Sequence, residues 1–156
     1  MVTKVVFICT ANTCRSPMAE YMFGAYLASR GVTDIEVASA GLYGDGVSRM
    51  AHNTREVLER RGIVDIKHVS KPYVRDDGPS VLFICMTRAH AENMPQTKNI
   101  VTMHEITGAD IDDPWGGSLA DYQRIETALQ NALPLMFDYV TAKHKKTKKK
   151  NGKQKS

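Results

Sequence analysis

A short N-terminal loop carries a cysteine and an arginine at its two ends, within the sequence VVFICTANTCRSPMAE. An apolar run ends at Cys9, five mostly small residues follow, and Arg15 stands directly before a Ser-Pro pair that is typical of a helix start. The backbone N–H groups of such a loop can converge on one point, and the helix adds its positive end. We therefore expect the loop to bind a tetrahedral oxyanion.

Cys9 and Arg15 have complementary chemistry toward a phosphoryl group. The planar, permanently charged guanidinium of Arg15 can hold two phosphoryl oxygens and strengthen that contact in the transition state. The same positive field favours Cys9 as a thiolate, which is a nucleophile able to attack phosphorus. The spacing alone is equally compatible with a buried cysteine at a strand end and a surface arginine.

A second segment, DIDDPWGGS at residues 110–118, offers the general acid that the leaving group would need. Asp113 is held extended by the proline that follows it, and two glycines allow the loop to bend toward the anion site. The flat indole ring of Trp115 could form one wall of the substrate pocket. The alternative is an ordinary turn before the last helix, with Ser118 as the helix N-cap.

The composition is that of one soluble globular domain. The chain has 156 residues, of which 42% are hydrophobic and 24% charged. Because neither a targeting segment nor a membrane span is apparent, we expect a cytoplasmic protein without membrane partners. The three cysteines, Cys9, Cys14 and Cys85, have no Cys-x-x-Cys pairing. We therefore expect neither a disulfide framework nor a zinc site, and no cofactor.

The net charge of +4 conceals two parts of opposite sign. Residues 143–156 contain eight lysines and no acid, so residues 1–142 carry a net charge of −4. We expect a domain of residues 1–142 followed by a flexible, lysine-rich tail, whose first residues extend the last helix. A contact of the tail with nucleic acid is the less favoured alternative.

Strand-like and helix-like segments alternate along the chain, which predicts an α/β fold. The expected strands are 5–9, 35–38, 81–87 and 100–103, and the expected helices are 16–30, 48–61, 88–94 and a long one with an apolar face over 119–140. Pro134 should kink or break the last helix. We expect a single three-layer domain with a central, mostly parallel four-stranded sheet and helices on both faces. Cys9 lies where such folds bind ligands, beyond a strand's carboxyl end.

Three motifs together resemble the low-molecular-weight protein tyrosine phosphatase family. They are CTANTCRS followed by PMAE, SAG at residues 39–41, and DPWGGS, in the family's order and spacing over about residues 3–142. The resemblance implies that Cys9 is the nucleophile that forms a cysteinyl-phosphate, Arg15 the phosphate clamp, and Asp113 the acid that later activates water. The phosphate-binding loop would consist of Thr10, Ala11, Asn12, Thr13 and Cys14.

The resemblance also implies supporting residues around this loop. Ser16 would hydrogen-bond the Cys9 thiolate, and Asn12 would brace the loop with help from Ser39 and His68. Plainer alternatives are a left-handed turn at Asn12 and a helix cap at Ser16, and we assign His68 no chemical step.

Two further positions of the loop need comment. Cys14 resembles the family's redox partner, which forms a reversible disulfide with the nucleophile, although it could also be inert packing. Ala11 departs from the glycine usual at that position. This departure raises the question whether the backbone there has a positive φ, which alanine tolerates only at a cost.

Thr13 bears on the substrate. The corresponding residue is commonly isoleucine in tyrosine-specific members and threonine in bacterial protein arginine phosphatases, which the motifs resemble more. A threonine hydroxyl makes the pocket wall more polar, which suits a guanidinium better than a phenyl ring, whereas Trp115 can stack on either. We expect a protein phosphatase whose partners are phosphorylated proteins, with phosphoarginine favoured over phosphotyrosine and with phosphate or vanadate as inhibitors.

Two other functional classes fit the sequence less well. Arsenate reductases share this scaffold but need two further cysteines near Arg88, where only Cys85 is close. A phosphate-binding module without catalysis would be favoured if Cys9 or Asp113 were absent, and both are present.

Overall fold

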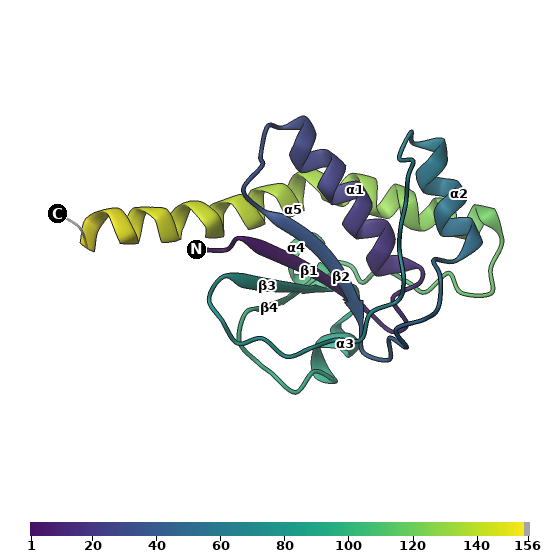
Figure 1. The fold of residues 1–156 in the computed structure, drawn as a ribbon, viewed down its shortest axis with the longest axis horizontal. Coiled ribbons are helices and arrows are strands. Elements are labelled where there is room, and N and C mark those ends of the chain that lie inside the picture. Colours follow the sequence, from purple (N-terminus) through teal and green to yellow (C-terminus); the bar gives the residue numbers. More distant parts are fainter. Residues whose placement is uncertain (155–156) are drawn as a thin grey trace.

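The computed structural model describes residues 1–154, with side chains through residue 144. Within this range, four strands form one sheet in the order β2-β1-β3-β4 (Figure 1). The strands are β1 (Lys4–Cys9), β2 (Glu36–Gly41), β3 (Val81–Cys85) and β4 (Ile100–Thr102). All three strand pairs are parallel, so the expected α/β fold with a parallel four-stranded sheet is confirmed.

Five helices are present in residues 1–154: α1 (Arg15–Ser29), α2 (His52–Arg60), α3 (Arg88–Glu92), α4 (Met103–Thr107) and α5 (Leu119–Gln154). Val5 and Phe7 of β1 belong to the larger apolar cluster, to which α1, α2, α4 and α5 contribute. Val6 and Ile8 belong to a smaller cluster on the opposite face, against which α3 packs through Ala91. Because successive strand residues point to opposite faces, this alternation gives three layers with helices on both sides of the sheet.

The boundaries of β2 and α2 differ most from the sequence prediction, whereas other predicted ends shift by one or two residues. β2 continues to Gly41 because residues 39–41 pair with Phe7, Ile8 and Cys9 of β1. α2 begins at His52, and the predicted start at Ser48 is wrong. Residues 48–51 are held by other parts of the chain: the Ser48 carbonyl accepts from Ser70 N, and Ala51 N donates to the Thr13 carbonyl. These long-range hydrogen bonds override the local helical pattern.

α5 is continuous through Pro134, so the alternative of a broken helix is wrong. Leu133 and Met136, on either side of the proline, are buried in the larger cluster, which holds both halves of the helix against the sheet layer. The helix continues to Gln154, through most of the lysine-rich segment. α4 was not expected from the sequence.

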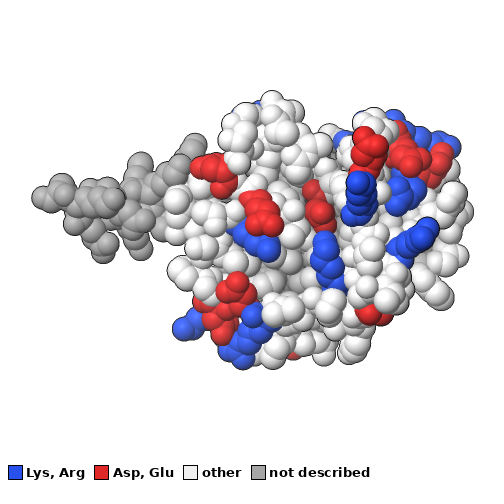
Figure 2. Space-filling view, in the orientation of Figure 1, with Lys and Arg blue, Asp and Glu red and all other residues white. Residues whose placement is uncertain are grey.

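On the face shown in Figure 2, lysine and arginine side chains lie beside acidic ones rather than in a patch of one sign. Ion pairs in the structure include Lys4 with Glu36 and Arg75 with Asp77. Within residues 1–154, no helix is long and apolar enough to span a membrane.

Candidate active site

The loop between β1 and α1 lies at the carboxyl edge of the sheet, and its shape depends on Asn12. Asn12 has φ = 60°, whereas Ala11 is not among the residues of positive φ in the described chain. Asparagine tolerates this left-handed conformation better than most residues. The absence of a glycine at position 11 therefore imposes no backbone strain.

The side chain of Asn12 is completely buried, and hydrogen bonds use both ends of its amide. Nδ2 donates to Ser16 Oγ and to Ser39 Oγ, both at 2.8 Å, and Oδ1 accepts from Lys71 N at 3.0 Å. The backbone carbonyl of Asn12 accepts from His68 Nε2 at 2.8 Å. The amide thus joins the loop to α1, β2 and the segment after residue 67.

The carbonyl groups of the loop are all bonded from outside it. The carbonyls of Cys9, Thr10 and Thr13 accept from the backbone N–H groups of Leu42, Tyr43 and Ala51. The Ala11 carbonyl accepts from Ser70 Oγ at 2.7 Å. Because the N–H and C=O groups of a peptide point in opposite directions, this arrangement turns the loop N–H groups toward the interior of the loop.

Cys9 lies at the bottom of the cavity that the loop encloses. Its Sγ is buried and lies 2.9 Å from Ser16 Oγ at the start of α1. The cavity has a volume of about 240 Å³ and is lined by Cys9, Thr10, Ala11, Thr13, Cys14, Arg15, Asp113 and Trp115. This volume is suited to a phosphoryl group and the first atoms of the side chain that carries it.

Arg15 is buried and joins the phosphate loop to the DPWGGS loop. Its Nη1 donates to the Ile111 carbonyl at 3.1 Å, and its Nη2 donates to Thr10 Oγ1 at 3.3 Å. Nη2 also lies 3.6 Å from Asp113 Oδ2. These contacts hold the guanidinium at the wall of the cavity that Cys9 also lines.

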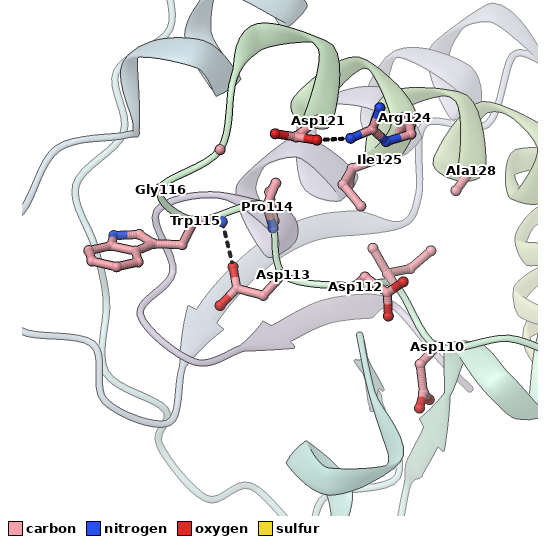
Figure 3. A pocket seen from close by; sticks show the side chains of 12 residues that line it. Asp110, Asp112, Asp113, Pro114, Trp115, Gly116, Asp121, Arg124, Ile125 and Ala128 are labelled. Carbon is pink, nitrogen blue, oxygen red and sulfur yellow. Dashed lines mark hydrogen bonds and ion pairs between the residues drawn. The ribbon is translucent and has the colours of Figure 1, made fainter.

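Asp113 and Trp115 form the outer wall. Asp113 Oδ1 accepts from Trp115 N at 3.0 Å (Figure 3). Trp115 is 78% exposed. Figure 3 shows that the side chain of Asp112 points away from that of Asp113. Asp112 lines an adjoining cleft of about 540 Å³, which Asp113 also lines and which does not include Cys9. Of the two carboxylates, Asp113 is the one that lines the cavity of Cys9.

The same loop also makes the turn that begins α5. Ser118 N donates to Asp121 Oδ2 at 2.8 Å, and Asp121 N lies 3.4 Å from Ser118 Oγ. This reciprocal pattern caps the helix. The alternative of an ordinary capped turn is thus compatible with a role of Asp113 at the cavity.

The other two cysteines have different surroundings. Cys14 lines the cavity, and its Sγ lies 3.4 Å from Tyr122 Oη. Burial raises the pKa of the Cys14 thiol, while hydrogen bonds from Tyr122 and Thr13 oppose this. Burial also raises the pKa of Cys85, to about 12, and its Sγ lies beside Met94 in the smaller apolar cluster.

The structure brings the predicted site residues together in two shells. Apart from Asn12, the predicted residues of the loop line the cavity together with Asp113 and Trp115. Asn12, Ser16, Ser39 and His68 form hydrogen bonds that support the loop. Within the described residues, no group of three or more His, Cys, Asp or Glu side chains could hold a metal ion.

His90, Glu20 and Tyr122 are among the residues at the site that sequence reasoning missed. His90 Nε2 lies 3.0 Å from Thr10 Oγ1, Glu20 Oε1 accepts from Ser39 Oγ at 2.5 Å, and Tyr122 contacts Cys14. His90 had a usable signal, because it follows the predicted strand 81–87, whose carboxyl end lies at the same edge of a parallel sheet as Cys9. Glu20 and Tyr122 lie within helices and had no such signal.

Residues 4–150 match the family described as low molecular weight phosphotyrosine protein phosphatase. A protein-arginine-phosphatase from Bacillus subtilis is 32% identical over 138 residues, which cover 83% of this chain and 91% of that protein. The low molecular weight protein-tyrosine-phosphatase PtpB from Staphylococcus epidermidis is 26% identical over 147 residues, which cover 90% of this chain and 99% of that protein.

A solved structure of the arginine phosphatase YwlE, a mutant with a phosphorylated serine in its active site, has a TM-score of 0.78 to this chain at 27% identity. The match covers 88% of this chain and 95% of the YwlE chain. The family model spans nearly the whole sequence, and the fold, the loop geometry and the relatives agree with it. The chain therefore belongs to the low molecular weight phosphotyrosine protein phosphatase family.

Proposed function

We propose that this protein is a cysteine-dependent protein phosphatase that acts through a cysteinyl-phosphate intermediate. The observation that carries the proposal is the convergence of Cys9, Arg15 and Asp113 on one cavity of about 240 Å³. A nucleophile, an anion clamp and a proton donor are the three groups that a two-step displacement at phosphorus requires.

In the first step, the Cys9 thiolate attacks phosphorus while Arg15 and the loop N–H groups hold the phosphoryl oxygens. The S–P bond forms as the bond from phosphorus to the leaving nitrogen or oxygen breaks, and the electron pair of that bond goes to the leaving atom. Asp113, in its protonated form, gives this atom a proton. Asp113 lines the same cavity as Cys9, and its side chain is half-exposed.

In the second step, water attacks the phosphoryl group from the side that the leaving group has left. The Asp113 carboxylate takes a proton from this water, the P–S bond breaks, and its electron pair returns to Cys9. The Ser16 hydroxyl, 2.9 Å from Cys9 Sγ, stabilises the thiolate that leaves. The phosphorylated serine in the active site of the YwlE mutant supports a covalent phosphoenzyme.

We further propose phosphoarginine as the preferred substrate. Thr13 lines the cavity, and its hydroxyl contacts Cys14 Sγ at 3.7 Å, a weak partner that leaves the oxygen available to a guanidinium N–H. Asp113 would attract the same cation. The similarity to a protein named protein-arginine-phosphatase supports this choice. Phosphate and vanadate should inhibit, since each occupies the same anion site.

The experiment that tests the mechanism is rapid acid quenching of wild-type enzyme with substrate, followed by intact mass spectrometry. We expect the mass of one phosphoryl group on Cys9, and no such mass in Cys9→Ala. Cys85→Ala, which removes a cysteine outside the cavity, is the matched control and should trap phosphate as wild type does. Phosphate bound on another residue would contradict the mechanism.

The substrate class is tested by kcat/KM on paired peptides that differ only in carrying phosphoarginine or phosphotyrosine. A higher value for phosphoarginine is expected. A higher value for phosphotyrosine would contradict the specificity and leave the phosphatase mechanism intact.

A further inference from the structure

His90 reaches the phosphate loop from a different part of the sheet edge. It lies in α3, which follows β3, and its side chain is 6% exposed. Its two ring nitrogens have different neighbours: Nε2 lies 3.0 Å from Thr10 Oγ1, and Nδ1 lies 3.2 Å from Thr87 N. The neighbours determine which nitrogen carries hydrogen.

Nδ1 must be an acceptor, because the backbone N–H of Thr87 can only donate. The Thr87 hydroxyl, 2.9 Å from the same nitrogen, can donate to it as well. A neutral imidazole then carries its hydrogen on Nε2. Burial, and secondly the charge of Arg15, lower the pKa of His90 to about 4, although Asp113 and Asp110 oppose the shift. The ring is therefore neutral near pH 7, and Nε2–H donates to Thr10.

Thr10 Oγ1 receives two hydrogen bonds. One comes from His90 Nε2 at 3.0 Å and the other from Arg15 Nη2 at 3.3 Å, since a guanidinium can only donate. A hydroxyl oxygen has two acceptor positions, and both are thus occupied. The hydroxyl hydrogen of Thr10 has to point in a third direction, and Thr10 lines the cavity together with Cys9 and Arg15.

We propose that the Thr10 hydroxyl donates a hydrogen bond to a phosphoryl oxygen of the substrate, and that His90 is the positioning residue that fixes the direction of this donor. This inference rests on the proposed function, because it assumes that a phosphoryl group occupies the cavity. It assigns to the Thr10 side chain a contact separate from that of the loop backbone, and it gives the α3 segment a part in substrate binding.

The Thr10 contact is tested by titrating inorganic phosphate into wild type, Thr10→Val and Thr10→Ser by calorimetry, which does not require turnover. Valine has the shape of threonine without the hydroxyl, so loss of a hydrogen bond to a charged oxygen should raise the Kd by roughly 10- to 100-fold. Serine keeps the hydroxyl and should bind near the wild-type level. A Thr10→Val variant that binds phosphate as wild type does would overturn the inference.

The role of His90 is tested with two variants that lose the same Nδ1 acceptor. His90→Gln can still donate to Thr10 through its amide N–H, whereas His90→Leu cannot. Both should lose similar thermal stability, but only His90→Leu should weaken phosphate binding and lower kcat/KM in the manner of Thr10→Val. Equal losses of binding in the two variants would show a merely structural role and overturn the assignment.

The double variant Thr10→Val/His90→Leu closes a mutant cycle. If His90 acts through Thr10, the double variant should have a Kd for phosphate no higher than that of the single variant that binds more weakly. Each change alone removes the hydrogen bond from the Thr10 hydroxyl to phosphate, so it cannot be lost twice. Additive losses would contradict this coupling. A wild-type protein that binds phosphate through Thr10 yet hydrolyses no phosphorylated peptide would contradict the proposed function alone, so the two failures can be distinguished.

Discussion

Asp113 and Asp112 are neighbours of the same chemical type, and only their positions distinguish them. Asp113 lines the cavity of Cys9, and Asp112 lines the adjoining cleft. We predict that Asp113→Asn lowers kcat for an aryl phosphate by roughly 10²- to 10⁴-fold, as expected for loss of a positioned general acid. Asp112→Asn is the matched control and should have little effect. The loss should shrink for substrates with very good leaving groups, and the reverse order of the two variants would refute the assignment of the acid.

Thr13 is the residue on which the choice of substrate depends. Thr13→Ile removes a polar partner of a guanidinium and adds apolar contact for a phenyl ring. Because threonine and isoleucine are both β-branched, the substitution should not change the loop backbone. We predict a fall in kcat/KM of roughly 5- to 100-fold for phosphoarginine peptides, the worth of an unmade hydrogen bond, with no fall for phosphotyrosine peptides. The measurement is the ratio of the two values. An equal fall on both substrates would indicate general damage to the loop.

The sequence was sufficient to predict those cavity residues that lie in contiguous motifs. Cys9, Arg15 and Asp113 belong to such motifs, and the structure places them together. His90 and Tyr122 belong to no such motif and could not be predicted from one. They contact Thr10 and Cys14 across 80 and 108 positions of the chain, so their role depends on strand order and helix docking rather than on local pattern.

At the level of the elements, the end of β2 and the loop after β1 constrain each other. A Cβ atom at Gly41 would lie 2.6 Å from the Thr10 carbonyl oxygen and 2.8 Å from Asn12 N. Distances this short to backbone atoms require the loop to move. We predict that Gly41→Ala lowers kcat/KM on an aryl phosphate by roughly 10- to 100-fold, as small misplacements of reacting groups do.

Gly24 provides the control for this substitution, since a Cβ atom there would meet no atom within 4 Å. Gly24→Ala, in the middle of α1, should leave activity unchanged and raise stability by about 0.5 to 1 kcal/mol, because alanine is the better helix former. Full activity in Gly41→Ala would show that the loop adapts without loss of the anion site.

Apart from α4, the elements followed from apolar periodicity and from glycine and serine at their ends, but the start of α2 and the continuity of α5 did not. α2 begins four residues later than predicted because Ser48 and Ala51 bond to Ser70 and Thr13. α5 continues through Pro134 because the residues on both sides are buried. In both cases, contacts distant in sequence outweigh the local preference of the chain.

For the molecule as a whole, His144 bears on where the folded unit ends. The domain boundary at residue 142 stays a prediction. His144 lies two residues beyond this boundary. His144 is buried, with Nδ1 2.6 Å from the Val2 carbonyl oxygen and Nε2 2.9 Å from Asp34 Oδ2. These contacts join the end of the described side chains in α5 to the N-terminus and to the segment before β2.

Two truncations separate His144 from the lysines that follow it. Removal of residues 145–156 should leave the unfolding temperature and aryl phosphate turnover unchanged, because these residues follow the last buried apolar position, Val140, and His144. Removal of residues 143–156 should also take away the buried histidine with its two hydrogen bonds, which should cost about 1 to 3 kcal/mol of stability. Thermal unfolding measures both, and full-length His144→Ala should reproduce the second loss. A large drop after the shorter truncation would instead show that residues beyond 144 stabilise the fold, and it would move the boundary of the folded unit into the lysine-rich segment.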